Sequence, residues 1–90
     1  MIINYPEVAV RELIDEVLEN YKKKNPDICD CERCRNDIMA LALNNLPVKY
    51  IVTEKGHIYT KAIFDQIGGK AQVIAALTAA IQKVHKFPRH

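Results

Sequence analysis

The sequence lacks most of the features that would assign it to a familiar functional class. Its 90 residues hold no apolar run long enough to span a bilayer, and no signal-peptide pattern opens the chain. It has no GxGxxG, phosphate-binding loop or HExxH motif, and no convincing pair of nucleophile and base. We therefore expect a cytoplasmic protein that has no membrane association and is not an enzyme.

An excess of charge of one sign is also missing. Thirteen basic and eleven acidic residues leave a formal net charge of +2, and the longest basic run is the three lysines at positions 22–24. These lysines fall where a first helix should end, and the helix dipole favours positive charge there without any ligand. A nearly neutral chain releases few counterions on a polyanion, so we do not expect nucleic acid to be a partner.

The chain is short, and we assign residues 1–90 to a single domain. A core of this size buries only about 60% of the surface that the unfolded chain would expose. Small domains therefore need further support from a bound metal, a disulfide or a subunit interface.

Apolar residues at helical spacing predict a first helix. It begins near Asn4, whose side chain can cap it while Glu7 answers from the third helical position, and it ends before residues 25–27. Most of the remaining positions are acidic, which is typical of an amphipathic helix that packs one face. That apolar face comprises Val10, Leu13, Ile14, Val17, Leu18 and Tyr21.

A second helix is expected from Cys31 or Glu32 to Asn45. Its apolar residues form two stripes on different sides, namely Cys34, Ile38, Leu41 and Ala42, and then Met39, Leu43 and Leu46. A helix that is apolar nearly all round must be buried. Because so short a chain can hardly surround it, we infer that a second subunit covers part of it in a homodimer.

The second half of the chain predicts a hairpin and a last helix. Residues 48–53 and 58–60 are rich in β-branched and aromatic side chains and flank a turn at residues 54–57. A helical region follows over residues 61–86, interrupted at Gly68 and Gly69. Its apolar stripe is Ile63, Ile67, Ile74, Leu77, Ile81 and Val84. The expected fold is mainly α, a small helical domain with one short β-hairpin that forms a homodimer.

All three cysteines, Cys29, Cys31 and Cys34, lie in the short segment CDCERC. The last two open the second helix, where free backbone N–H groups lower thiol pKa values and favour the thiolate. The CxxC spacing lets two sulfurs reach one tetrahedral centre, and Cys29 can supply a third. We therefore predict that these three cysteines bind a structural zinc ion.

The predicted zinc site is one ligand short, because structural zinc normally takes four. We assign His57, in the predicted turn, as the fourth. The alternatives are a water, a partner subunit, or His85, His90, Asp27 or Asp30. A redox pair or an iron–sulfur cluster would also use these cysteines, although a redox CxxC of the thioredoxin type follows a strand and this one follows a helix and a proline-containing loop.

The stretch CDCERCRNDIMALALNNLP, running into VKYIVTEKGHIYTK, resembles the late competence development protein ComFB family, and the closing FPRH extends the resemblance to essentially the whole chain. The resemblance implies a small, mostly helical homodimer with cysteine-bound zinc, first named from an operon of DNA-uptake genes in naturally competent bacteria. The metal role carries over to Cys29, Cys31 and Cys34. Cyanobacterial members are linked to binding of cyclic di-GMP, and Lys49 stands where relatives often have arginine.

The sequence thus favours a non-enzymatic, zinc-stabilised, dimeric regulatory or interaction protein of the ComFB type, with an unidentified protein as its partner. The alternative is a second-messenger receptor that binds cyclic di-GMP across the dimer, since a two-fold ligand suits a two-fold interface. In that case Arg33, Arg35 and Lys49 would neutralise phosphates while Tyr50 stacks on a base. Each of these side chains could equally be a solvated surface group.

Overall fold

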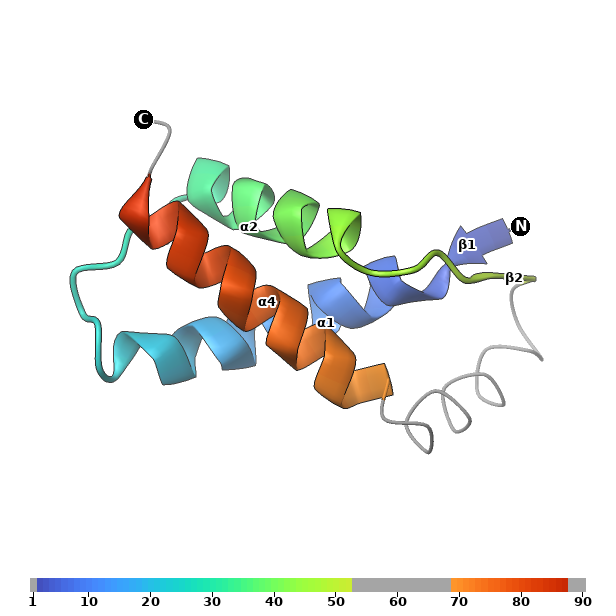
Figure 1. Ribbon diagram of the computed structural model, residues 1–90, viewed down its shortest axis with the longest axis horizontal. Coiled ribbons are helices and arrows are strands. Elements are labelled where there is room, and N and C mark those ends of the chain that lie inside the picture. The colour runs from blue at the N-terminus through green and yellow to red at the C-terminus, as the bar shows by residue number, and fades with distance from the viewer. Residues whose placement is uncertain (1, 53–68, 88–90) are drawn as a thin grey trace.

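The computed structural model describes residues 2–52 and 69–87. Within these ranges the chain forms three helices and a two-stranded sheet (Figure 1). In chain order the elements are β1 (Ile2–Asn4), α1 (Tyr5–Lys22), α2 (Glu32–Asn44), β2 (Tyr50–Val52) and α4 (Gly69–Lys86). The mainly helical fold expected from the sequence is confirmed, and none of the described helices is long and apolar enough to cross a membrane.

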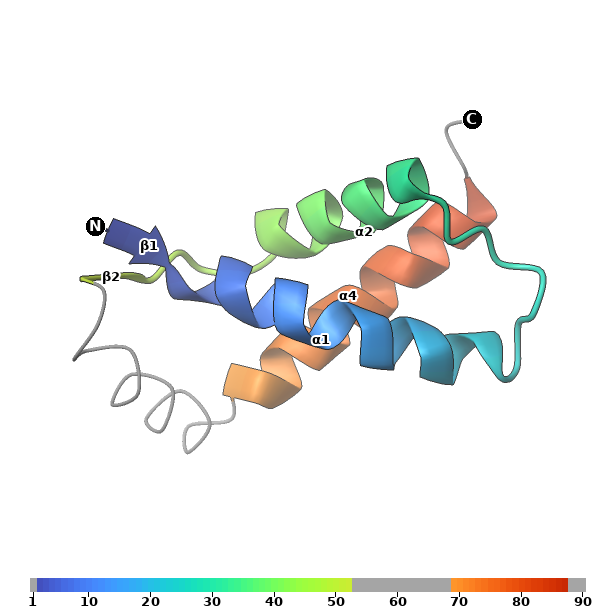
Figure 2. The ribbon, with the colours of Figure 1, turned by 180° about the vertical axis from the view of Figure 1, so that it is seen from behind.

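Helix α4 has the most extensive packing contacts of the three described helices. It packs against both α1 and α2, which also contact each other, and the view from behind in Figure 2 shows it crossing α1 obliquely. The apolar faces of the three helices meet in one core. Its most deeply buried large side chains are Val10, Leu18, Cys34, Ile38, Val73, Leu77 and Ile81.

The apolar patterns locate the helices well, with one error in α4. The predicted stripe includes Ile74, yet Ile74 is 37% exposed and Val73 is fully buried in its place. Val73, Leu77, Ala80 and Val84 form the centre of the buried face, so Ile74 falls at its edge. Ile63 and Ile67, from the same predicted stripe, lie outside the described residues.

Both predicted stripes of α2 contribute to the core. Cys34, Ile38 and Ala42 are buried, and the second stripe of Met39, Leu43 and Leu46 is half-buried and packs against the same cluster. Helices α1 and α4 therefore cover much of α2 within one chain. The homodimer that we inferred from this helix stays a prediction.

The cap predicted for α1 is wrong in its chemistry. Asn4 occupies the position before the helix, but its side chain makes no capping hydrogen bond. Its Oδ1 instead accepts a hydrogen bond of 2.8 Å from the backbone N–H of Lys49, and Glu7 is paired with Arg11 at 3.2 Å. Asn4 has this different partner because it also ends strand β1, beside the segment that leads into β2.

Strand β1 is the element that the sequence did not predict. It pairs antiparallel with β2 in the register Ile2 with Val52, Ile3 with Ile51 and Asn4 with Tyr50. The backbone N–H of Tyr5 extends the ladder by donating to the carbonyl of Lys49 at 2.7 Å. β2 lies within the predicted strand at residues 48–53, whereas its predicted hairpin partner at residues 58–60 lies outside the described residues.

Candidate metal centre

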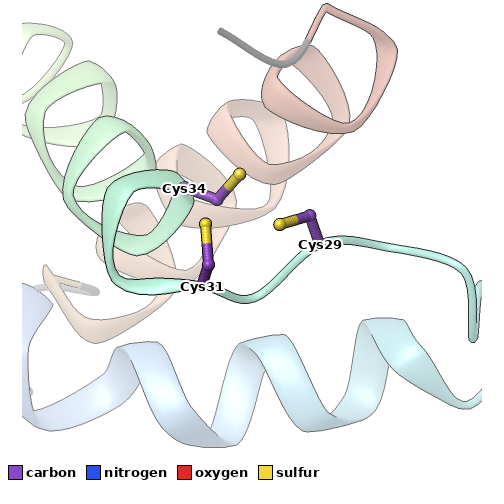
Figure 3. Close-up of side chains that lie close together, drawn as sticks. All are labelled: Cys29, Cys31 and Cys34. Carbon is purple, nitrogen blue, oxygen red and sulfur yellow. The ribbon is translucent and has the colours of Figure 1, made fainter. Parts of the chain in front are cut away.

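Three cysteine sulfurs gather at the start of α2. Cys29 comes from the loop between α1 and α2, Cys31 immediately precedes α2, and Cys34 lies in the first turn of α2. The sulfurs all lie within 4.8 Å of one another, and Figure 3 shows them converging on one small space. No disulfide joins them. The structure therefore brings together the three cysteines that the sequence assigned to zinc.

The three thiols differ sharply in their surroundings. Cys34 is 1% exposed and belongs to the helical core, Cys29 is half-buried and Cys31 is exposed. Burial, together with the neighbouring thiols, raises the pKa of Cys34 to about 12, so the expectation that the helix start lowers this pKa is wrong for Cys34. The pKa of Cys31 is lowered from its ordinary value, mainly because the backbone N–H of Cys34 stabilises the thiolate and then because the Cys29 thiol does so. The surroundings thus favour the thiolate at Cys31 and the neutral thiol at Cys34.

The loop that carries Cys29 is fixed by contacts of its own. The carbonyl of Tyr21 accepts hydrogen bonds from the backbone N–H and the side-chain amide of Asn25, which turn the chain at the end of α1. Ile28 then enters the core. Lys22 forms an ion pair with Asp30, which raises the pKa of the lysine and lowers that of the carboxyl. These contacts hold the segment on both sides of Ile28.

His85, near the end of α4, also contacts this loop. On α4, His85 Nδ1 lies 3.0 Å from the hydroxyl of Tyr21, and the two rings meet edge to face at 5.7 Å. The other ring nitrogen, Nε2, lies 3.4 Å from Oδ2 of Asp27. His85 therefore connects the end of α1 with the cysteine loop. Sequence reasoning missed this role, because nothing local relates residues that are 58 and 64 positions apart.

The fourth ligand predicted from the sequence is not found among the described residues. His85, one of the candidates, places its two ring nitrogens against Tyr21 and Asp27, and Asp30 is paired with Lys22. His57 and His90 lie outside the described residues. Over residues 2–52 and 69–87, the group of potential ligands around this space consists of the three cysteines.

The donor set suits a thiophilic metal ion. Around tetrahedral zinc with Zn–S bonds of about 2.3 Å, neighbouring sulfurs lie about 3.8 Å apart. The observed separations, within 4.8 Å, need to close by about 1 Å at most for such a geometry. A bound cation would also favour ionisation of the buried Cys34, since a coordinating thiol is deprotonated outright. An iron–sulfur cluster would require a fourth cysteine ligand in its usual form, and the chain has three cysteines.

The predicted phosphate-binding residues lie in two places. Arg33 and Arg35 are in the first turn of α2, where Arg35 forms an ion pair with Asp15 on α1. Lys49 and Tyr50 follow the opposite end of α2, and Tyr50 is 66% exposed. A helix of 13 residues spans about 20 Å, so within one chain the four do not form a single cluster.

Three comparisons place the chain among known proteins. A family model described as "Late competence development protein ComFB" matches residues 3–88. The competence protein ComFB of Bacillus subtilis (strain 168) is 34% identical over 83 residues, which cover 90% of this chain and 81% of that protein. The solved structure of the late competence protein ComFB from Bacillus subtilis matches with a TM-score of 0.74 at 27% identity, over 98% of this chain and 92% of that one.

Proposed function

The chain belongs to the ComFB family of late competence development proteins, and on that basis we propose that it is a non-catalytic, zinc-binding regulatory or interaction protein that acts as a homodimer. The observation that carries the proposal is the convergence of Cys29, Cys31 and Cys34 at the joint between two helices. Three thiolates from a loop and a helix start can bind one metal ion and cross-link these two segments.

Zinc would stabilise a chain that is already folded. It would connect the loop at Cys29 to the first turn of α2, and through Cys34 to the core. A ligand that binds only the folded state stabilises it by about 2.7 kcal/mol when its free concentration is 100 times its dissociation constant. The fourth ligand remains a proposal, and we keep His57 for it, with a water as the alternative.

An apolar strip on the sheet supports the homodimer. Tyr50 and Val52 alternate along β2, Ile2 stands opposite Val52 on β1, and Val48 lies two residues before β2. All four are about two-thirds exposed. Alternate residues of a strand project to the same face, so Ile2, Tyr50 and Val52 share one face of the sheet. Exposed apolar side chains gathered in this way are typical of protein interfaces. We propose that this strip packs against the same strip of a second copy.

Metal analysis of protein purified without a metal-affinity tag tests the zinc half of the proposal. About one zinc per chain is expected, with all three thiols reacting much more slowly with an alkylating reagent than after a chelator is added. Cys31→Ser should lose the metal while remaining folded, because Cys31 is exposed. Asn36→Ala, an exposed change on the same helix, is the matched control and should retain it. Native protein without zinc after supplementation would refute the site.

Sedimentation equilibrium tests the dimer separately. The native chain should sediment as a dimer at micromolar concentration, and Tyr50→Glu together with Val52→Lys should produce a folded monomer. Ile74→Lys changes an apolar residue of α4 outside the strip and should leave the dimer intact. A native monomer would remove the dimer without affecting the metal site. The cyclic dinucleotide receptor stays an expectation from the sequence.

A further inference from the structure

Cys31 and Cys34 combine proximity with very different exposure. Their sulfurs lie within 4.8 Å, yet one is at the surface and the other is part of the core. They are separated by two residues at the start of α2, the CxxC arrangement in which reactive thiols occur at helix N-termini. An oxidant from solvent can therefore reach Cys31 first, and Cys34 is the buried neighbour positioned to trap the product.

The loop does not depend on these cysteines for its position. Asn25 turns it, Ile28 anchors it in the core, and the pairs of Lys22 with Asp30 and His85 with Asp27 hold it on both sides. Loss of a metal would therefore leave the three thiols near their present positions. A site that survives metal loss in this way can be emptied and refilled.

We propose that Cys31 and Cys34 form a reversible disulfide on reaction with a hydroperoxide, and that this disulfide releases the metal ion bound at the cysteine cluster. The release of metal depends on the zinc site proposed above. The formation of the disulfide does not, and it can be tested on metal-free protein. The proposal assigns the cluster a regulatory chemistry in addition to bracing the fold.

The reaction balances with hydrogen peroxide as the oxidant. The Cys31 thiolate attacks one peroxide oxygen, the O–O bond breaks, and the departing hydroxide takes a proton to become water. Cys31 is then a sulfenic acid. The sulfur of Cys34 attacks the sulfur of Cys31, the S–O bond breaks, and hydroxide leaves with the proton of Cys34 as a second water. Two thiols are oxidised to one disulfide and one peroxide is reduced to two waters.

The disulfide removes two of the three sulfur ligands. Cys29 alone would then remain of the described cluster, and a single thiolate provides no chelate. A dithiol reductant restores both thiols by exchange, and the fixed loop returns Cys29 to the same place. We assign the disulfide to Cys31 and Cys34 because these two have the CxxC spacing at the start of α2, whereas Cys29 comes from the preceding loop.

The test uses the zinc-loaded full chain, equimolar hydrogen peroxide and a chromophoric zinc indicator. We expect release of about one zinc per chain, in step with a disulfide between Cys31 and Cys34 mapped by mass spectrometry after alkylation and proteolysis. Reductant with added zinc should restore binding. Cys31→Ser should abolish the disulfide, while Cys29→Ser should still form it. Asn36→Ala should behave as the native chain.

The possible failures are distinguishable. If the untreated protein holds no zinc, the proposed metal function fails, and the same mapping on metal-free protein still decides whether the disulfide forms. If zinc is present and stays bound at peroxide doses that oxidise a free thiol standard, the redox proposal is overturned while the zinc site stands. A disulfide through Cys29, or conversion of Cys31 to sulfinic acid without a disulfide, also overturns it.

Discussion

Replacing Tyr21 by phenylalanine tests how much the contact between Tyr21 and His85, beside the cysteine loop, stabilises the metal-free protein. The change removes only the hydroxyl that lies 3.0 Å from His85 Nδ1, and it keeps the ring that packs edge to face on the imidazole at 5.7 Å. The other nitrogen of that imidazole faces Asp27 in the loop at 3.4 Å. The hydroxyl therefore orients the ring that connects α4 with the cysteine loop.

The expected loss follows from one partly buried hydrogen bond. Such a bond contributes about 0.5–1.5 kcal/mol net, and the exposed contact of His85 with Asp27 adds little, since exposed ion pairs are worth about 0–1 kcal/mol. We therefore expect Tyr21→Phe to lower the free energy of unfolding by about 1 kcal/mol. In a domain of this size that lowers the melting temperature by about 4–8 °C.

Urea unfolding of the metal-free, reduced protein, followed by circular dichroism, measures this loss directly. Asn36→Ala, an exposed change on α2, is the control and should stay within about 0.5 kcal/mol of the native chain. The double variant of Tyr21→Phe with His85→Ala should show coupling, so that its loss is smaller than the sum of the single losses. Equal stability of Tyr21→Phe and the native chain, or strict additivity, would refute the role assigned to this contact.

Three further outcomes test the fold and its charges. Ile38→Ala empties a fully buried position and should lower the free energy of unfolding by about 2–5 kcal/mol in the same assay. Asn4→Ala removes the acceptor of the Lys49 N–H and should speed amide exchange at Lys49, measured by NMR. Because Lys22 lowers the pKa of Asp30, that pair stabilises the fold above the ordinary carboxyl pKa and ceases to do so as pH falls through the lowered one. In Lys22→Met the NMR titration of Asp30 should move up toward the ordinary value.

The helices were predictable because their information is local. Apolar spacing of three and four residues, together with the stops at either end, located α1, α2 and α4 to within a few residues. The error at Ile74 arose because two neighbouring registers of the same stripe fit the pattern almost equally well. Only packing against α1 and α2 decides between Val73 and Ile74.

The sheet was not predictable by the same reasoning. Strand β1 has three residues, too few to show a period of two, and it pairs with a segment almost fifty residues later in the chain. A local explanation for Asn4, as a helix cap, was available and was wrong. The side chain instead binds the backbone of Lys49, which only the folded arrangement brings near.

For the candidate site, too, the local features were predictable from the sequence and the long-range contacts were not. The cysteines share one short segment, so their spacing alone predicted that their sulfurs meet, as they do within 4.8 Å. The position of that segment also depends on His85, which contacts Tyr21 at the end of α1 and Asp27 in the loop. His85 is 64 and 58 positions away from these residues, so the sequence does not reveal either contact. From the sequence, His85 could be named only as a possible metal ligand.

Cys34 places one sulfur of the candidate metal site inside the hydrophobic core. Its thiol is 1% exposed and has a pKa of about 12, so in the metal-free chain it is a neutral core side chain that stabilises packing. In a metal-bound chain the same sulfur must carry charge in that apolar place, which is tolerable only beside a cation. The free energy that a metal would gain by binding Cys34 would therefore be partly offset by the cost of ionising a buried thiol. This opposition favours a bound metal that can be released, because the core remains packed when Cys34 takes its proton back.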